Sequence, residues 1–195
     1  MKKTLLLLII VSSLFSNAAA ETSSLVKRIF VGNEDAKITI LAYESLTCSH
    51  CANFHKNVYP ELKKEYLDTG LAKIEFRHFP LDITALNAAK ISQCKNNGDP
   101  KILMSLYDNQ QKWIKGSTIE EANKNLQNFL NNEGFEIDFE KCINNTEIED
   151  FILNDRIDGV KNFKINATPT IIINNEKFEK TLDYKNLKKA LEKLI

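Results

Sequence analysis

The sequence predicts an α/β fold that is interrupted by a block of helices. Three observations support this prediction. A strand pattern, a helical pattern and a second strand pattern follow one another over residues 38–79, residues 81–146 carry helical patterns only, and strand patterns return after residue 169. We therefore expect one α/β domain formed by residues 21–80 and 147–195, with an all-helical insertion at 81–146.

Residues 1–20 have the pattern of a secretory signal peptide. Lys2 and Lys3 precede an apolar run from Leu5 to Val11, and small residues follow at positions 18–20. An uncleaved membrane anchor is the alternative, but the run is shorter than the roughly 20 residues that span a bilayer. We expect cleavage near Ala20 and, from the short Lys-Lys signal and the Lys- and Asn-rich composition, a bacterial periplasmic protein.

The first α/β unit begins with a β-branched run from Ile38 to Tyr43, which predicts a buried strand. Thr47 is placed to cap a helix that starts at Cys48, and Pro60 falls inside this helix and predicts a kink. Leu71 to Phe79 alternates as a second strand, so the two strands are expected to pair in parallel. The apolar face of the helix carries Phe54, Val58, Leu62 and Tyr66.

The helical insertion contains three apolar patterns at helical spacing. The third begins with capping-box spacing at Ser117 or Thr118. The same spacing at Thr146 predicts the start of a long helix through Phe163. The apolar side of this long helix is expected to hold Ile148, Phe151, Ile152, Val160 and Phe163.

The C-terminal part returns to strand patterns. Thr170 to Ile173 predicts a strand, Asn174 and Asn175 a turn, and Lys177 to Glu179 the partner strand of a hairpin. Apolar residues at helical spacing between Leu187 and Leu194 predict a closing helix.

Composition restricts the function. The chain has 195 residues, 43% of them hydrophobic, and 26 Lys and Arg balance 26 Asp and Glu. These proportions are typical of a globular protein and exclude a disordered chain. Because no basic excess is available to neutralise phosphates, we expect no nucleic-acid partner.

Cys48-Ser49-His50-Cys51 places two cysteines three residues apart at the start of the predicted helix. Residues at this spacing lie on one face of the first turn, within reach of a disulfide. The unpaired N–H groups of the helix start favour the thiolate of Cys48 and lower its pKa, and an imidazolium at His50 acts in the same direction. A stabilised thiolate favours the reduced form, which makes the disulfide a strong oxidant.

Other interpretations of these residues remain open. A purely structural disulfide constrains little over two intervening residues, and a zinc site through Cys48, Cys51 and His50 or His55 lacks a second ligand pair at the usual spacing. His50 is also compatible with a plain surface residue. The strand–helix context favours a redox site in which the Cys48–Cys51 disulfide is the reactive group, with no metal and no other cofactor.

The chain resembles the DsbA family of thiol–disulfide oxidoreductases, which have a thioredoxin-like fold with an inserted helical domain. The resemblance covers nearly all of the chain after residue 20. It is carried by Val31–Lys37, by the Cys48–Cys51 motif with its His before the second Cys, by the helix after that motif, and by Ala167-Thr168-Pro169-Thr170.

The resemblance implies a substrate-binding face. Pro169 is expected to be cis and to face the cysteine pair, and Thr168 to present its backbone to an extended substrate peptide. The alternative for Pro169 is a plain strand-entry proline. Ser49, placed at the same face, stands where the best-known oxidases have proline, so the redox potential is expected to differ from theirs.

The sequence departs from the family at a buried acidic position. Many relatives carry an acid six residues before the first Cys, where this chain has Ala42. Glu44 lies two residues on, on the same strand face, and either Glu44 or a water is the candidate proton relay for the buried thiol. The alternative for Glu44 is a solvated strand-end carboxylate. His55 and His78 are interpreted as helix-surface and strand-end residues rather than ligands.

Cys94 and Cys142 are expected to form a structural disulfide, because an exported chain with an even number of cysteines usually pairs them. Closing a loop of this length is worth about 4 kcal/mol in the chain-entropy model. The alternative is a second redox pair, which lacks the adjacent-turn spacing. Some alphaproteobacterial members of the family resemble this arrangement.

The functional hypothesis is a monomeric periplasmic oxidase that introduces disulfides into reduced exported proteins. By resemblance, a DsbB-like membrane quinone reductase reoxidises it. Two alternatives stay open: a disulfide isomerase or reductase of the same fold, and a peptide-binding, chaperone-like module whose cysteine pair is vestigial.

Overall fold

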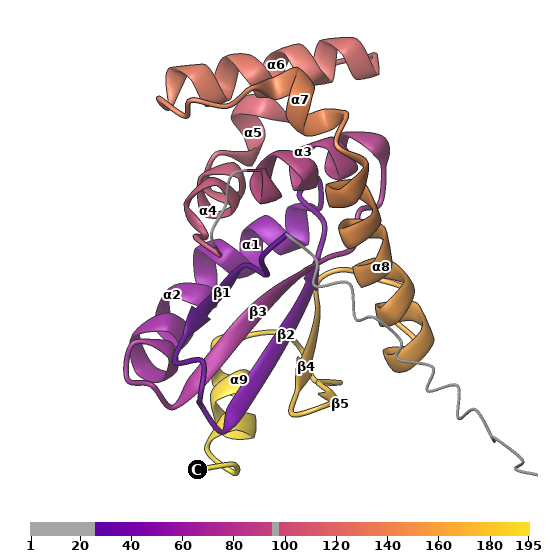
Figure 1. Cartoon of the computed structure of the whole chain (residues 1–195). Coiled ribbons are helices and arrows are strands. Elements are labelled where there is room, and N and C mark those ends of the chain that lie inside the picture. Colours follow the sequence, from indigo (N-terminus) through magenta and orange to yellow (C-terminus); the bar gives the residue numbers. More distant parts are fainter. Residues whose placement is uncertain (1–25, 95–97) are drawn as a thin grey trace, which may run out of the picture.

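A computed structural model of the chain describes residues 26–94 and 98–195 (Figure 1). The predicted signal peptide at 1–20 lies outside these residues. The elements are β1 (Phe30–Gly32), β2 (Ile38–Glu44), α1 (Ser49–Asn57), α2 (Tyr59–Leu62), the π-helical turn η1 (Lys63–Leu67), β3 (Ala72–His78), α3 (Ile83–Gln93), α4 (Lys101–Asp108), α5 (Gln110–Trp113), α6 (Ile119–Asn132), α7 (Phe139–Ile143), α8 (Thr146–Phe163), β4 (Thr170–Ile173), β5 (Glu176–Lys177) and α9 (Tyr184–Leu191). The predicted α/β class is confirmed.

The strands of the described residues form one mixed sheet in the order β1-β3-β2-β4-β5. β2 and β3 are parallel, with Glu44 opposite His78 at their C-terminal ends, as the predicted βαβ unit requires. The other neighbours pair antiparallel. The final hairpin turns at Asn174 and Asn175, which both have positive φ, and its second strand starts one residue earlier than predicted, at Glu176.

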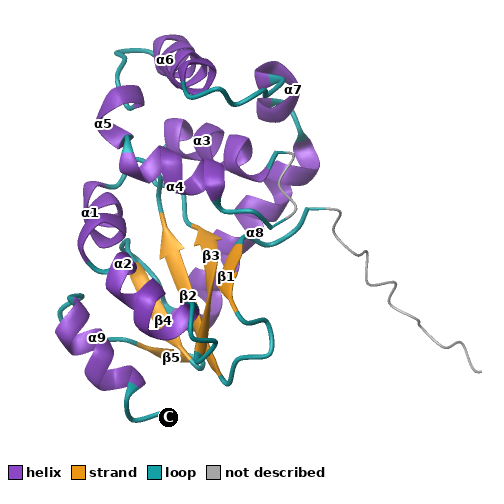
Figure 2. Cartoon of the chain, turned by 90° about the vertical axis from the view of Figure 1, so that its left-hand side faces the viewer, coloured by secondary structure: helices purple, strands orange, loops and turns teal. Residues whose placement is uncertain are grey.

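The two faces of the sheet are buried by different helices (Figures 1 and 2). Alternate residues of β2 point to opposite faces: Ile40 belongs to the main core with residues of α1, α2 and α9, whereas Tyr43 belongs to a second cluster with Phe163. Helix α8 approaches Tyr43 closely at Gly159, where an added Cβ would lie 2.8 Å from Tyr43 Cε1. Glycine is therefore required at this contact.

The helical stretch between β2 and β3 is broken rather than only kinked. Helix α1 ends at Asn57, and α2 begins at Tyr59 with Pro60 in its first turn, where a missing N–H costs little. The predicted apolar face is nonetheless buried throughout. The prediction that Thr47 caps this helix is wrong. Cys48 is the N-cap residue of α1, and Thr47 Oγ1 instead donates to Asp82 Oδ2 at 2.7 Å.

Helices α3–α7 lie together at the end of the sheet where β2 and β3 finish (Figure 2). Trp113 of α5 is fully buried there, and its Nε1 donates to the Leu106 carbonyl at 2.8 Å. Thr118 caps α6 as predicted. The cap of α8 is Asn145 rather than Thr146, because the Asn145 side chain accepts from the Ile148 N–H at 3.0 Å.

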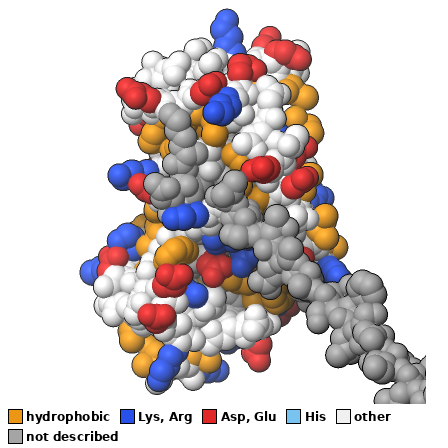
Figure 3. Space-filling model, viewed as in Figure 1, with side chains coloured by type: hydrophobic (Ala, Val, Ile, Leu, Met, Phe, Trp, Pro, Cys, Tyr) orange, Lys and Arg blue, Asp and Glu red, His pale blue; other side chains and the backbone are white. Residues whose placement is uncertain are grey.

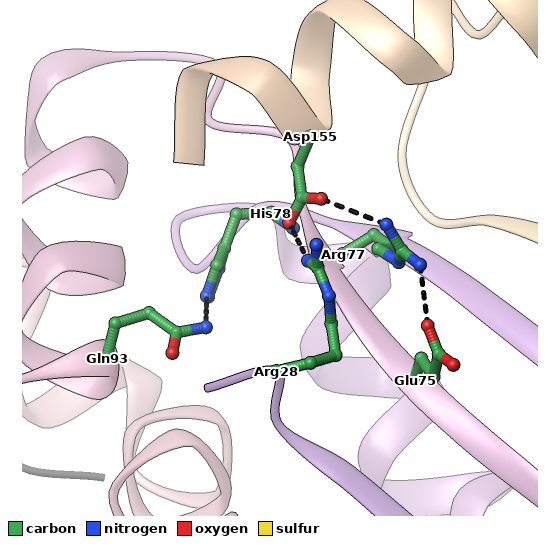
Figure 4. Close-up of polar contacts among 6 residues, drawn as sticks. All are labelled: Arg28, Glu75, Arg77, His78, Gln93 and Asp155. Atoms are coloured by element: carbon green, nitrogen blue, oxygen red, sulfur yellow. Dashed lines mark hydrogen bonds and ion pairs between the residues drawn. The ribbon is translucent and has the colours of Figure 1, made fainter. Parts of the chain in front are cut away.

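Helix α8 is held to the sheet by a buried carboxylate, Asp155 (Figure 4). Its side chain is 1% exposed and accepts hydrogen bonds from Arg28 Nη1, from Arg77 Nη1 at 3.3 Å and from the His78 N–H at 3.1 Å. Asp155 shares the buried face of α8 with Ile148, Ile152 and Gly159. Val160 lies beyond this face and is 47% exposed, so the predicted apolar side of α8 is wrong at this residue.

His78 lies at the end of β3, as predicted, but it is buried. Its Nε2 lies 2.9 Å from Gln93 Nε2 (Figure 4). Burial, with a smaller contribution from the charge of Arg28, lowers the pKa of His78 to about 3. The ring is therefore neutral near pH 7 and serves as a hydrogen-bonding core residue.

The described surface carries both signs of charge. On the face shown in Figure 3, basic and acidic side chains are interspersed and no extended patch of one sign is present. Within residues 26–94 and 98–195, no helix combines the length and the apolar character needed to cross a membrane.

Candidate active site

The two motif cysteines lie at the start of α1, directly after β2. Cys48 is the N-cap residue and is partly buried, whereas Cys51, in the first turn, is 0% exposed; both are free thiols. The Cys48 carbonyl accepts the N–H groups of Cys51 and Ala52, at 3.1 and 3.2 Å. The Cys48 side chain is therefore partly accessible to solvent, whereas that of Cys51 is buried.

The Thr168–Pro169 peptide bond is cis and faces this helix start. Cys48 Sγ lies 3.4 Å from the Thr168 carbonyl oxygen, to which the thiol donates. Ser49 and His50 are exposed beside Cys48. The structure therefore brings the predicted substrate-face residues together around the accessible sulfur.

The environment of Cys48 favours its thiolate. The pKa of Cys48 is lowered to about 5, first because the Cys51 thiol donates to it, and further by the Thr168 side chain and the backbone N–H groups of Cys51 and His50; burial acts in the opposite direction. The His50 imidazole is not among these causes. The stabilisation comes chiefly from the neighbouring Cys51 thiol and from the backbone N–H groups of the helix start.

The environment of Cys51 favours its thiol. Burial raises the pKa of Cys51 far above its ordinary value, and the hydrogen bond with Cys48 and the charge of Glu44 add to this effect. The two sulfurs of one motif therefore have opposite acid–base properties at neutral pH.

Glu44 is buried next to this pair and is not solvated. It is 4% exposed, and its Oε2 lies 2.9 Å from Nε2 of His55, which is also 4% exposed. The interpretation of His55 as a helix-surface residue is wrong. Its ring stacks on Tyr107 at 4.0 Å between centroids. Glu44 Oε1 and His55 Nδ1 have no hydrogen-bond partner among the described residues.

Sequence periodicity contained a signal for His55. Cys51, Phe54 and Val58 are buried at helical spacing, and His55 follows Cys51 by four residues, so it falls on the same face. A polar residue at such a position needs a buried partner. Glu44, at the end of the preceding strand, is that partner.

A second polar residue that sequence reasoning missed comes from the helical block. Gln110 of α5 is 3% exposed, and its Nε2 donates to the Leu46 carbonyl at 2.8 Å and to the Cys48 carbonyl at 3.0 Å. These contacts cross more than sixty residues of sequence, so no local pattern indicates them.

The other two cysteines lie away from this site, at the end of α3 and in α7. Cys94 and Cys142 form a disulfide with a Cα–Cα distance of 5.6 Å. It joins two helices of the helical block. Across residues 26–94 and 98–195, no group of three or more His, Cys, Asp or Glu side chains is arranged to hold a metal ion.

Fold and site together define a thioredoxin-fold protein with a dithiol at a helix start and a cis-proline opposite it. Comparison with known proteins agrees. A family model described as "Thioredoxin" matches residues 24–193. The crystal structure of Wolbachia pipientis alpha-DsbA1 superposes with a TM-score of 0.76 at 31% identity, covering 86% of this chain and 90% of that one. The chain belongs to the thioredoxin family, and within it to the DsbA proteins.

Other relatives extend this likeness. A Rickettsia bellii protein named "Putative protein-disulfide oxidoreductase" is 28% identical over 169 residues, which is 85% of this chain and 63% of the relative. The chain thus spans less than two thirds of that relative's length. Bacillus subtilis BdbD shares the fold, with a TM-score of 0.65 at 23% identity over 86% of this chain and 92% of that one.

Proposed function

We propose that the protein is a dithiol oxidase that transfers a Cys48–Cys51 disulfide to reduced exported proteins in the periplasm. The observation that carries this proposal is the contrast between the two sulfurs: Cys48 is accessible with a pKa lowered to about 5, and Cys51 is buried with a raised pKa. A stable Cys48 thiolate favours the reduced enzyme and therefore makes its disulfide a strong oxidant.

The exchange takes two steps. In the oxidised enzyme a substrate thiolate attacks Cys48 Sγ, the Cys48–Cys51 bond breaks, and Cys51 leaves with the bonding electrons and takes up a proton. A second substrate thiolate then attacks the substrate sulfur of the mixed disulfide and releases Cys48 as a thiolate. The substrate dithiol has lost two electrons and the enzyme has gained them. A DsbB-like membrane quinone reductase then removes these electrons from the enzyme.

The surface around Cys48 suits an unfolded polypeptide. Thr168 lies against Cys48, next to the cis-Pro169, and its backbone is placed to pair with an extended peptide. Leu81 and Ile83 are 50% and 51% exposed on either side of Asp82, which binds Thr47 beside the active cysteine. Apolar side chains that an unfolded substrate exposes would bury against them.

Glu44 and His55 provide the proton path for Cys51. Glu44 is close enough for its charge to act on Cys51, and its Oε1 has no partner among the described residues. In the reverse, reoxidation direction, Cys51 must lose its proton while buried, and the unpartnered oxygen supports Glu44 as the acceptor. His55 holds the other oxygen and fixes the carboxylate.

The decisive experiment is the equilibrium of the cysteine pair with glutathione. A potential toward that of DsbA, about −120 mV, would support an oxidase, whereas a value near about −270 mV, that of thioredoxin, would contradict an oxidase and favour a reductase. Cys48→Ser should abolish oxidation of a dithiol peptide, and Cys51→Ser should trap mixed disulfides. Activity that survives Cys48→Ser would favour a chaperone-like module instead.

Localisation and assembly are tested separately. Expressed in a bacterial host, the chain should appear in the periplasmic fraction with a new N-terminus near residue 21, read by mass spectrometry. Size-exclusion chromatography with light scattering should give a monomer. A cytoplasmic, full-length product would contradict the export proposal.

A further inference from the structure

Gln110 connects the helical block to the catalytic loop. It is the first residue of α5 and is buried. Both of the hydrogen bonds that its amide donates end on backbone carbonyls of the segment between β2 and α1, those of Leu46 and Cys48. Gln110, a side chain of the helical block, thus binds the backbone of Cys48, the residue whose sulfur reacts.

The Cys48 carbonyl has a special role in this segment. It is the carbonyl that begins α1, because it accepts the N–H groups of Cys51 and Ala52. Gln110 adds a third donor to it, at 3.0 Å. The same amide ties Leu46, two residues earlier, at 2.8 Å. The loop is therefore fixed on both sides of Thr47.

We propose that Gln110 is a positioning residue for Cys48: its amide fixes the loop backbone so that Cys48 Sγ stays aimed at the N–H groups of the first helical turn and at Thr168. The inference rests on the proposed function only in that Cys48 is the reacting thiol. Gln110 itself touches neither sulfur nor substrate in this role. It acts through the carbonyls that it holds.

The orientation of Cys48 matters because its thiolate is stabilised by directional contacts. The Cys51 thiol and the backbone N–H groups of Cys51 and His50 all contribute, and hydrogen bonds weaken steeply when their angles change. A loop freed from Gln110 would sample orientations in which these contacts are longer or bent. The thiolate, which belongs to the reduced form, would lose stabilisation and the disulfide would become less oxidising.

Gln110 also lines a cavity of about 460 Å³ between α1 and the α4–α5 segment, together with Ala52, Lys56 and Tyr107. A shorter side chain would enlarge this cavity and admit water to the freed carbonyls. Methionine is the better probe, because it nearly keeps the length and volume of glutamine while it removes the amide that binds the two carbonyls.

The test compares Gln110→Met with Gln111→Met. Gln111 is the next residue of the same helix and is exposed, so the control makes the same chemical change away from the loop. For each reduced protein, thiolate absorbance near 240 nm is followed against pH, and the glutathione equilibrium is measured. Gln110→Met should raise the pKa of Cys48 by about half a unit to one unit and shift the equilibrium about three- to tenfold toward the disulfide. Gln111→Met should match the native protein.

A purely structural role gives a different result. If Gln110→Met melts at a lower temperature but titrates like the native protein, the proposal is overturned. If that variant fails to fold, NMR of the native protein decides: the side-chain N–H protons of Gln110 should exchange more slowly than those of Gln111 and shift on reduction of the cysteine pair. Equal exchange for the two glutamines, or no shift, overturns the proposal.

The outcome is independent of the oxidase proposal, because both measurements use the cysteine pair alone without a protein substrate. A native protein that fails to oxidise peptides while Gln110→Met still shifts the titration would reject the proposed function and keep this inference. A native enzyme that oxidises peptides, together with a Gln110→Met variant whose titration matches the native protein, would keep the proposed function and reject this inference.

Discussion

Two buried carboxylates near the ends of the central parallel strands differ in how completely they are bound. Glu44 ends β2 and lies opposite His78 of β3, whose N–H binds Asp155 of α8. Asp155 receives two guanidinium donors in addition to this N–H. Glu44 has the single partner His55, and one of its oxygens has no hydrogen-bond partner among the described residues.

The difference separates a structural acid from a chemically available one. Asp155 has its oxygens engaged by donors that hold α8 against the sheet. Glu44 keeps one oxygen without a partner among the described residues, next to the buried Cys51 thiol. Burial alone therefore does not indicate a functional acid; the number of filled acceptor sites does.

The largest effect should come from removing Asp155. Asp155→Ala leaves Arg28 and Arg77 partly buried without their shared anion, so the free energy of unfolding should fall by about 3 kcal/mol, the lower end for a broken buried ion pair because both arginines keep some solvent contact. Urea unfolding measures this. Asp158→Ala, at an exposed position of the same helix, is the control. A loss of oxidase activity in folded Asp155→Ala would remove the distinction between the two acids.

Replacing Glu44 should affect chemistry more than stability. Glu44→Gln keeps the shape but removes the proton acceptor, so reoxidation of the reduced enzyme by a small disulfide should slow by on the order of 10²-fold, in the range of general acid–base catalysis. Stopped-flow fluorescence measures the rate, with exposed Glu61→Gln as the control. If Glu44→Gln is reoxidised at the rate of the native protein, Glu44 is not the proton acceptor and water takes that role.

Variants of His55, the hydrogen-bond partner of Glu44, measure how much this one bond contributes to stability. His55→Phe leaves Glu44 without its hydrogen bond and should lower the free energy of unfolding by about 1–3 kcal/mol. His55→Gln keeps a donor and should cost less. Denaturant unfolding of both variants gives the difference. A larger loss in His55→Gln than in His55→Phe would mean that the stacking of His55 on Tyr107, which phenylalanine preserves, accounts for the stability rather than the bond to Glu44.

A separate prediction concerns pH and involves neither of the two acids. The pKa of Cys48 falls from 9.0 to about 5 on folding, so between these values the unfolded chain binds a proton that the folded, reduced protein has released. Stability of the reduced protein should therefore rise from pH 5 to pH 9 relative to the oxidised protein, and this advantage should vanish below pH 5. Thermal melts of both forms across this range test it, and parallel curves would contradict a thiolate at Cys48.

Sequence reasoning found the parts of the site that are local in the chain. The cysteine pair, its helix and the strands around it follow from spacing and periodicity, and the resemblance added Pro169. Side-chain contacts over long separations were not accessible in this way. Asp155 was hidden inside a long helix whose apolar pattern is interrupted, and the capping choice between Asn145 and Thr146 depends on one hydrogen bond. Such choices are set by tertiary packing, which periodicity does not encode.

Trp113 gives the helical block its own optical signal. It is the only tryptophan of the chain, and it is fully buried three residues after Gln110, with its indole nitrogen bound to Leu106. Emission excited selectively from this indole therefore reports the environment of α5 and of the helices around it, and not that of the sheet. Unfolding of the helical block can therefore be followed at this position without attaching a dye.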